Sequence, residues 1–134
     1  MIYLDTAAAV KLVREESETA ALVEWLNNAA DQSLVSSALI EVELPRALRR
    51  SSPDVLGAAA GVLARLHRVD INAAVRATAA AYADPLLRSL DAIHLATADV
   101  LVASDKKITA FVTYDKRLAA SAVALGLPMT APGE

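Results

Sequence analysis

The sequence has no cysteine and only four glycines, one phenylalanine and one tryptophan among its 134 residues. Without cysteine the chain can form neither a disulfide framework nor a thiolate metal site, which suits a reducing compartment. No apolar run approaches the roughly 20 residues that a membrane span needs. The first residues also lack the basic region and long apolar core of a secretion signal. We therefore expect a cytoplasmic protein that does not cross a membrane.

Positive charge is not in excess either, because 13 lysines and arginines face 16 acidic residues, for a formal charge of −3. This balance argues against a strongly basic protein that coats nucleic acid regardless of sequence. It leaves room for a nucleic-acid enzyme, since metal-binding carboxylates add negative charge of their own. Hydrophobic residues make up 55% of the chain, which excludes a disordered protein. The length predicts one domain over residues 1–134.

Helices are expected to dominate, because alanine, the best helix former, is the most abundant residue. Short apolar runs alternate with these helices and predict strands, which implies a mostly parallel sheet covered on both faces. Ser17, Asn72 and Ser89 are candidate helix caps, and Pro45 is expected to disturb its helix. The predicted strands cover residues 2–4, 33–36, 67–71, 110–114 and 128–130.

Four acidic residues lie within these predicted elements. Asp5 and Asp115 each end a strand, and the functional crevice of a parallel sheet lies beyond the carboxyl ends of its strands. Glu43 has apolar helical neighbours, and Asp91 stands in the first turn of an apolar helix. Carboxylates that share one crevice raise one another's pKa unless a cation compensates. Hard oxygen ligands select Mg²⁺ or Mn²⁺.

Each acid also has a simpler explanation. Asp5 and Asp115 could cap the helices that follow them. Glu43 could pair with Arg46 on a solvated helix face, and Asp91 could complement the helix dipole. These alternatives are independent of one another, so the combined placement of the four acids carries more weight than any one of them.

Four segments stand out in order along the chain. They are Met-Ile-Tyr-Leu-Asp-Thr at residues 1–6, the block at residues 37–50, Leu-Asp-Ala-Ile-His-Leu-Ala-Thr-Ala at residues 90–98, and Phe-Val-Thr-Tyr-Asp-Lys-Arg-Leu at residues 111–118. Together they resemble the successive motifs of PIN-domain ribonucleases. Within that family, the small size and the ending Gly-Leu-Pro-Met-Thr-Ala-Pro-Gly resemble the VapC toxins of bacterial toxin–antitoxin pairs. Any one motif is weak, but four in the expected order and spacing are specific.

This resemblance implies a three-layer α/β/α sandwich with an acidic site for Mg²⁺ or Mn²⁺. Glu41 and Glu43 are two residues apart and so point about 200° apart around a helix, which means that only one can face the crevice. The family spacing favours Glu43, with Glu41 as the alternative. Thr113 matches a hydroxyl position beside the site. The metal ligands and catalytic residues implied are Asp5, Glu43, Asp91 and Asp115.

Other polar residues have competing explanations. His94 follows Asp91 by three residues and could form a ligand pair with it, but a packing histidine is the favoured interpretation. Trp25 is expected in the core or an interface. Two basic groups either contact phosphate or lie solvated at the surface, namely Arg46 with Arg49 and Arg50, and Lys116 with Arg117.

The resulting hypothesis is a metal-dependent endoribonuclease that acts as a toxin on an RNA substrate. The resemblance also implies a cognate antitoxin protein and a homodimer. One alternative is a non-catalytic interaction domain with the same fold. A second is a phosphatase with a strand-end aspartate nucleophile, which is weaker because Asp5 is followed by Thr6-Ala7 and not by a second aspartate.

Overall fold

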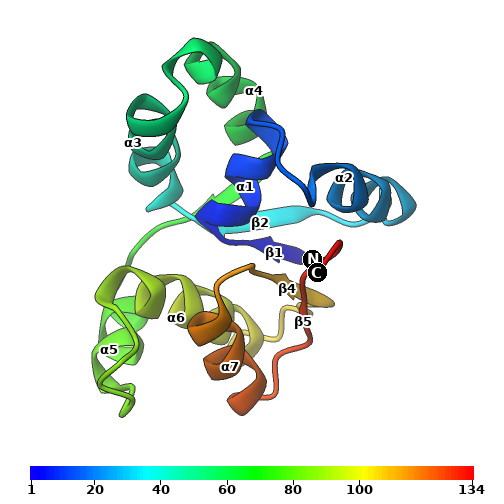
Figure 1. Cartoon of the computed structure of the whole chain (residues 1–134). Coiled ribbons are helices and arrows are strands. Elements are labelled where there is room, and N and C mark those ends of the chain that lie inside the picture. Colours follow the sequence, from blue (N-terminus) through cyan, green and yellow to red (C-terminus); the bar gives the residue numbers. More distant parts are fainter.

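In the computed structural model, which describes residues 1–134, five short strands form a single sheet (Figure 1). The order across the sheet is β3-β2-β1-β4-β5, and all neighbouring strands are parallel. The strands are β1 (Ile2–Leu4), β2 (Leu34–Ser37), β3 (Leu66–Val69), β4 (Ala110–Val112) and β5 (Met129–Thr130).

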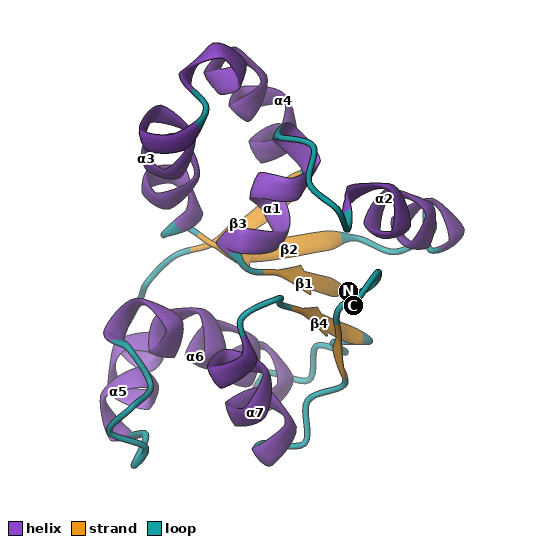
Figure 2. Cartoon of the chain, viewed as in Figure 1, coloured by secondary structure: helices purple, strands orange, loops and turns teal.

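Helices cover both faces of this sheet. Four of them, α1 to α4, lie on one face and α5 to α7 lie on the other, with the strands as a single layer between them (Figure 2). This confirms the predicted three-layer α/β/α sandwich. None of the helices combines the length and the apolarity that crossing a membrane requires. The helices are α1 (Thr6–Val13), α2 (Thr19–Asn28), α3 (Ile40–Ser51), a 3₁₀ turn (Pro53–Ala58), α4 (Ala59–Ala64), α5 (Ala73–Ala81), α6 (Ser89–Ala103) and α7 (Lys116–Ala124).

Alternating side chains of the central strands divide the core in two. Ile2 and Leu4 of β1 pack with residues of α1 to α4 in one buried cluster. Tyr3 points to the opposite face, where it joins Leu95 of α6 and Leu118 of α7 in a second cluster. Successive strand residues point to opposite faces, so a strand with both faces covered must be apolar throughout.

Two of the predicted helix caps are wrong. Ser17 does not cap α2, because Thr19 closes the preceding turn: its hydroxyl accepts a hydrogen bond from the Glu16 amide and donates one to the Lys11 carbonyl, both at 2.9 Å. Ser89 is the first residue of α6 and makes no capping bond. The Asn72 cap is confirmed, since its side chain accepts from the Val75 amide at 3.0 Å.

Helix α3 runs through Pro45 as one element. Proline has no amide hydrogen to donate to the carbonyl four residues earlier, which here belongs to Glu41. Glu41 lies in the first turn of α3 and its side chain is exposed. The helix continues because Leu44 and Leu48 on its buried face anchor it in the first core cluster.

The only phenylalanine provides a direct test of the second core cluster. Phe111 is fully buried in β4 and stacks on Tyr3 of β1, with ring centroids 5.0 Å apart and planes 6° apart. Phe111→Ala should lower the free energy of unfolding by about 3–5 kcal/mol, because it removes buried surface and leaves a cavity. Urea unfolding followed by circular dichroism measures the change, and a loss below about 1 kcal/mol would contradict this description of the core.

Candidate active site

The site lies where the chain changes direction across the sheet. From β1 the chain reaches β2 through helices on one face, whereas β4 connects to β5 through α7 on the other face. Such a reversal between neighbouring strands leaves a crevice at their carboxyl ends, where parallel α/β proteins bind ligands. Asp5 directly follows β1 and Asp115 follows β4 after two residues.

Both of these aspartates cap helices, as the simpler explanation allows. Asp5 accepts a hydrogen bond from the Ala8 amide at the start of α1, and Asp115 accepts one from the Leu118 amide at the start of α7, both at 2.9 Å. In each case the bond engages Oδ1 alone. Capping therefore orients the carboxylate and leaves the second oxygen for another partner.

For Asp5 that second partner is Thr113, whose hydroxyl donates to Oδ2 at 2.5 Å. Asp5 is buried, with 4% of its surface exposed, and this burial raises the pKa of its carboxyl. The hydrogen bond from Thr113 opposes the rise in pKa, and the charge of Asp91 adds to it. Thr113 thus lies beside the site, as predicted, and holds the first-strand aspartate.

Glu43 on α3 lies in the same crevice. Its Oε1 accepts hydrogen bonds from the Thr6 hydroxyl at 2.6 Å and from His94 Nε2 at 2.8 Å. Partial burial acts to raise the pKa of Glu43, but the bonds from His94 and Thr6 together hold it below its ordinary value. No ion pair joins Glu43 to Arg46, so the structure does not support the surface-pair explanation.

Glu41 faces a different direction. Its side chain is 48% exposed and pairs with Arg68 of β3 at 3.4 Å. The divergence follows from the helical geometry, because residues two apart on a helix point about 200° apart. The structure thus places Glu43, and not Glu41, beside the other acids.

Asp91 is half-buried in the first turn of α6. Burial is the largest cause that raises the pKa of Asp91, and the charges of Asp115 and Glu43 raise it further. Asp91 and Asp115 line one pocket of about 200 Å³ together with Leu86, Arg88, Lys116 and Arg117. The four predicted acids therefore share one electrostatic environment, in which Asp91 interacts with each of the other three.

The donor atoms in this environment suit a hard divalent cation. No three acidic or histidine side chains form a ready-made metal cluster in the structure. The available ligands are carboxylate oxygens, which match Mg²⁺ and Mn²⁺. The raised pKa values of Asp5 and Asp91 reflect burial and mutual repulsion, and a bound cation relieves both.

The remaining residues that the sequence singled out lie as follows. Trp25 is partly buried and packs against the first core cluster. Arg46, Arg49 and Arg50 are exposed along α3. Lys116 and Arg117 are also exposed, and unlike the α3 arginines they line the pocket that contains Asp91.

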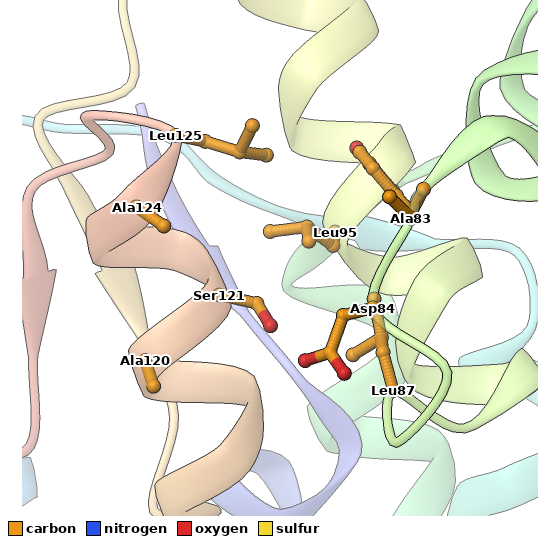
Figure 3. Close-up of a pocket in the computed structure, with 9 residues that line it drawn as sticks. Ala83, Asp84, Leu87, Leu95, Ala120, Ser121, Ala124 and Leu125 are labelled. Atoms are coloured by element: carbon orange, nitrogen blue, oxygen red, sulfur yellow. The ribbon is translucent and has the colours of Figure 1, made fainter.

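A second pocket, of about 300 Å³, is distinct from the acidic site. It lies between α7 and the segment that joins α5 to α6, and its lining is mostly apolar (Figure 3). The view shows Asp84 and Ser121 on opposite sides of it. None of the four predicted acids lines this pocket, so it offers no comparable metal chemistry.

Two residues of the site were missed or undervalued by sequence reasoning. The sequence pattern assigns no role to Thr6, and it favours a packing role for His94. His94 is indeed buried, with 2% of its surface exposed, yet its Nε2 bonds Glu43 across 51 residues of sequence. A usable signal was available, because His94 lies one helical turn after Asp91 and therefore on the same face of α6.

Comparison with known proteins places the chain in a class. A family model described as the PIN domain matches residues 2–124, and the chain belongs to this family. Ribonuclease VapC35 of Mycobacterium tuberculosis is 54% identical over 134 residues, which covers 100% of this chain and 98% of that protein. Ribonuclease VapC47 of the same species is 38% identical over 136 residues, which covers 99% and 98%. Within the PIN-domain family, the chain belongs to the VapC group.

Solved structures confirm the fold. VapC20 of Mycobacterium tuberculosis, a toxin that cleaves the sarcin–ricin loop, superposes with a TM-score of 0.69 at 17% identity and covers 90% of this chain and 95% of that chain. VapBC2 from Rickettsia felis, bound to a DNA fragment from its promoter, gives 0.66 at 16% identity and covers 98% and 99%.

The raised pKa of Asp91 predicts that ionisation of this side chain lowers the stability of the folded protein. A carboxyl whose folded-state pKa is raised contributes stability below its unfolded pKa and loses it as the pH rises through the folded value. At pH 7 the charged Asp91 therefore destabilises the metal-free protein, although the helix dipole partly compensates. Asp91→Asn should raise the melting temperature at pH 7, and the difference should shrink toward pH 4.

Thermal melting in chelator measures this difference. Asp31→Asn is the matched control, because Asp31 is exposed and precedes β2 at the opposite edge of the sheet. Adding Mn²⁺ should then raise the melting temperature of the unmodified protein more than that of Asp91→Asn. An Asp91→Asn variant that melts lower at pH 7 would contradict the repulsion.

Proposed function

We propose that this chain is a divalent-metal-dependent endoribonuclease and acts as the toxin of a toxin–antitoxin pair. The observation that carries the proposal is the gathering of Asp5, Glu43, Asp91 and Asp115 at the carboxyl edge of the sheet in a chain of the VapC group. Relatives of similar length, 54% and 38% identical, are named ribonucleases, which supports cleavage of RNA as the reaction. The cytoplasmic location predicted from the sequence agrees with an RNA substrate and stays a prediction.

The four carboxylates are the groups that would hold Mg²⁺ or Mn²⁺. When bound there, such a cation would supply positive charge, which lowers the pKa of water and stabilises charge on phosphodiester oxygens. Asp5 is pre-oriented by Thr113 and the Ala8 amide, and Glu43 by Thr6 and His94. Orientation before substrate arrives lowers the cost of assembling the reactive geometry.

Basic residues of the same pocket fit the substrate backbone. Arg88, Lys116 and Arg117 line it with Asp91, and none of the three forms an ion pair within the chain. Their charges are therefore available to phosphates on either side of the bond that is cut. The pocket thus combines cation ligands with phosphate contacts. The products expected are a 5′-phosphate and a 3′-hydroxyl.

A cognate antitoxin and a homodimer complete the proposal. The structural neighbour from Rickettsia felis is a VapBC assembly, which supports an antitoxin as the regulating partner. The acidic crevice is exposed at Asp115 and half-exposed at Asp91, so a protein that covers it would block RNA. A basic side chain of the antitoxin fits the charge of this crevice.

Cleavage of RNA by the antitoxin-free protein tests the proposal. With Mn²⁺ we expect cleavage that a chelator abolishes. Loss of an outer-shell partner alone costs about 10–100-fold in metal affinity or activity, so Asp91→Asn and Glu43→Gln should each lower cleavage at least about 100-fold. Glu41→Gln is the matched control and should keep nearly full activity, because Glu41 pairs with Arg68 outside the crevice.

The alternatives give different results in the same assay. A non-catalytic interaction domain cleaves no RNA of any class although it is folded and loaded with Mn²⁺. A phosphatase releases phosphate from a small phosphomonoester and leaves internal RNA bonds intact. Glu41→Gln as inactive as Glu43→Gln would show that the glutamate ligand has been assigned wrongly.

A further inference from the structure

The two carboxylate oxygens of Glu43 are not equivalent. Oε1 accepts from both Thr6 Oγ1, at 2.6 Å, and His94 Nε2, at 2.8 Å. These two donor atoms are themselves 3.1 Å apart, so the three groups form a closed triangle. Oε2 has no hydrogen-bond partner within the chain. One oxygen is therefore fixed by the protein, and the other is left for something outside it.

His94 is itself held in place from behind. Its Nδ1 contacts the Tyr3 hydroxyl at 2.7 Å, and Tyr3 is fully buried and stacked on Phe111. An ionised carboxylate only accepts hydrogen bonds, so Nε2 must be the donor to Glu43. In that tautomer Nδ1 accepts from Tyr3. Both ring nitrogens are engaged, which leaves neither free to bind a metal ion directly.

The two donors come from the chain segments that carry the other acids. Thr6 directly follows Asp5 at the start of α1, and His94 lies one turn after Asp91 on α6. Helices α1 and α3 lie on one face of the sheet and α6 lies on the other (Figure 1). The contact between His94 and Glu43 therefore links the helix that carries Asp91 to the helix that carries Glu43 in the opposite layer.

We propose that Thr6 and His94 are positioning residues that hold Oε1 of Glu43 and thereby present Oε2 to the divalent cation bound near Asp5 and Asp91. The proposal rests on the metal-dependent function argued above. Oε2 would then be the oxygen of Glu43 that faces the ion, directly or through water. Outer-shell partners of this kind fix a ligand's orientation, and their loss costs about 10–100-fold in metal affinity.

Calorimetric titration with Mn²⁺ in the absence of RNA tests the proposal without relying on activity. Thr6→Val and His94→Leu should each weaken Mn²⁺ binding at least about tenfold. His94→Gln should keep most of the affinity, because the glutamine amide can donate from near the position of Nε2. With Mn²⁺ at saturation, the KM for RNA should be unchanged in all three variants.

The controls separate positioning from general damage. Thr78→Val makes the same substitution at a half-buried position of α5 where the hydroxyl has no partner, and it should bind Mn²⁺ as the unmodified protein does. Circular dichroism and thermal melting establish that each variant is folded. Thr6→Val removes one hydroxyl from a half-buried residue, so the test does not depend on the deeply buried His94 alone.

Each remaining outcome has a definite meaning. If Thr6→Val and His94→Leu bind Mn²⁺ normally while Glu43→Gln does not, the proposal is wrong and the metal-dependent function stands. If His94→Gln binds Mn²⁺ as weakly as His94→Leu, and Thr6→Val binds it normally, the histidine merely fills space. The positioning role is then refuted as well. If Glu43→Gln binds Mn²⁺ normally, Glu43 is not a ligand. If the unmodified protein neither binds Mn²⁺ nor cleaves RNA, both proposals fail.

Discussion

The hydrogen bond between His94 on α6 and Glu43 on α3 joins the two helical layers at the edge of the sheet where the chemistry is placed. The sheet separates the two layers, and its strands are only two to four residues long, with β1 and β4 apolar on both faces. Beyond the carboxyl ends of the strands, polar side chains from the two layers hydrogen-bond one another. His94 contacts the Tyr3 hydroxyl through Nδ1 and Glu43 through Nε2. The packing of His94 against Tyr3 in the core therefore also constrains the position of Glu43 in the site.

The same edge concentrates negative charge at a cost to stability. Burial and neighbouring carboxylates raise the pKa values of Asp5 and Asp91. The charged forms of these two side chains are therefore less stable in the folded chain than in water. Thr113, His94 and the Ala8 amide oppose the rise at Asp5 only in part, and His94 and Arg88 do the same at Asp91. Sites of this kind are typical of function and not of stability, because selection retains unfavourable groups where they act. In the function proposed above, a divalent cation would supply the missing compensation, and metal binding would then stabilise the fold.

Much of this arrangement could be predicted from local sequence. Short apolar runs that alternate with helices predict a parallel sheet, and parallel connectivity places Asp5 and Asp115 at one edge. Helical geometry predicts that only one of Glu41 and Glu43 faces the site. In the structure Glu41 points away from the site and pairs with Arg68. The sequence places His94 on the same helix face as Asp91, but it does not predict that Thr6 and His94 bond Glu43, because these contacts span 37 and 51 residues. The caps expected of Ser17 and Ser89 failed for a similar reason, since neighbouring tertiary and turn contacts decide where a helix begins.

A crystal structure of the protein with bound Mn²⁺, with the ion located by its anomalous scattering, tests the central claim most directly. We expect a peak at the carboxyl edge of the sheet, within ligand distance of carboxylate oxygens from Asp5 and Asp91. Glu43 should face the ion with Oε2, directly or through water, while His94 keeps its bond to Oε1. No peak at saturating Mn²⁺, or an ion bound directly to a His94 nitrogen, would contradict the account.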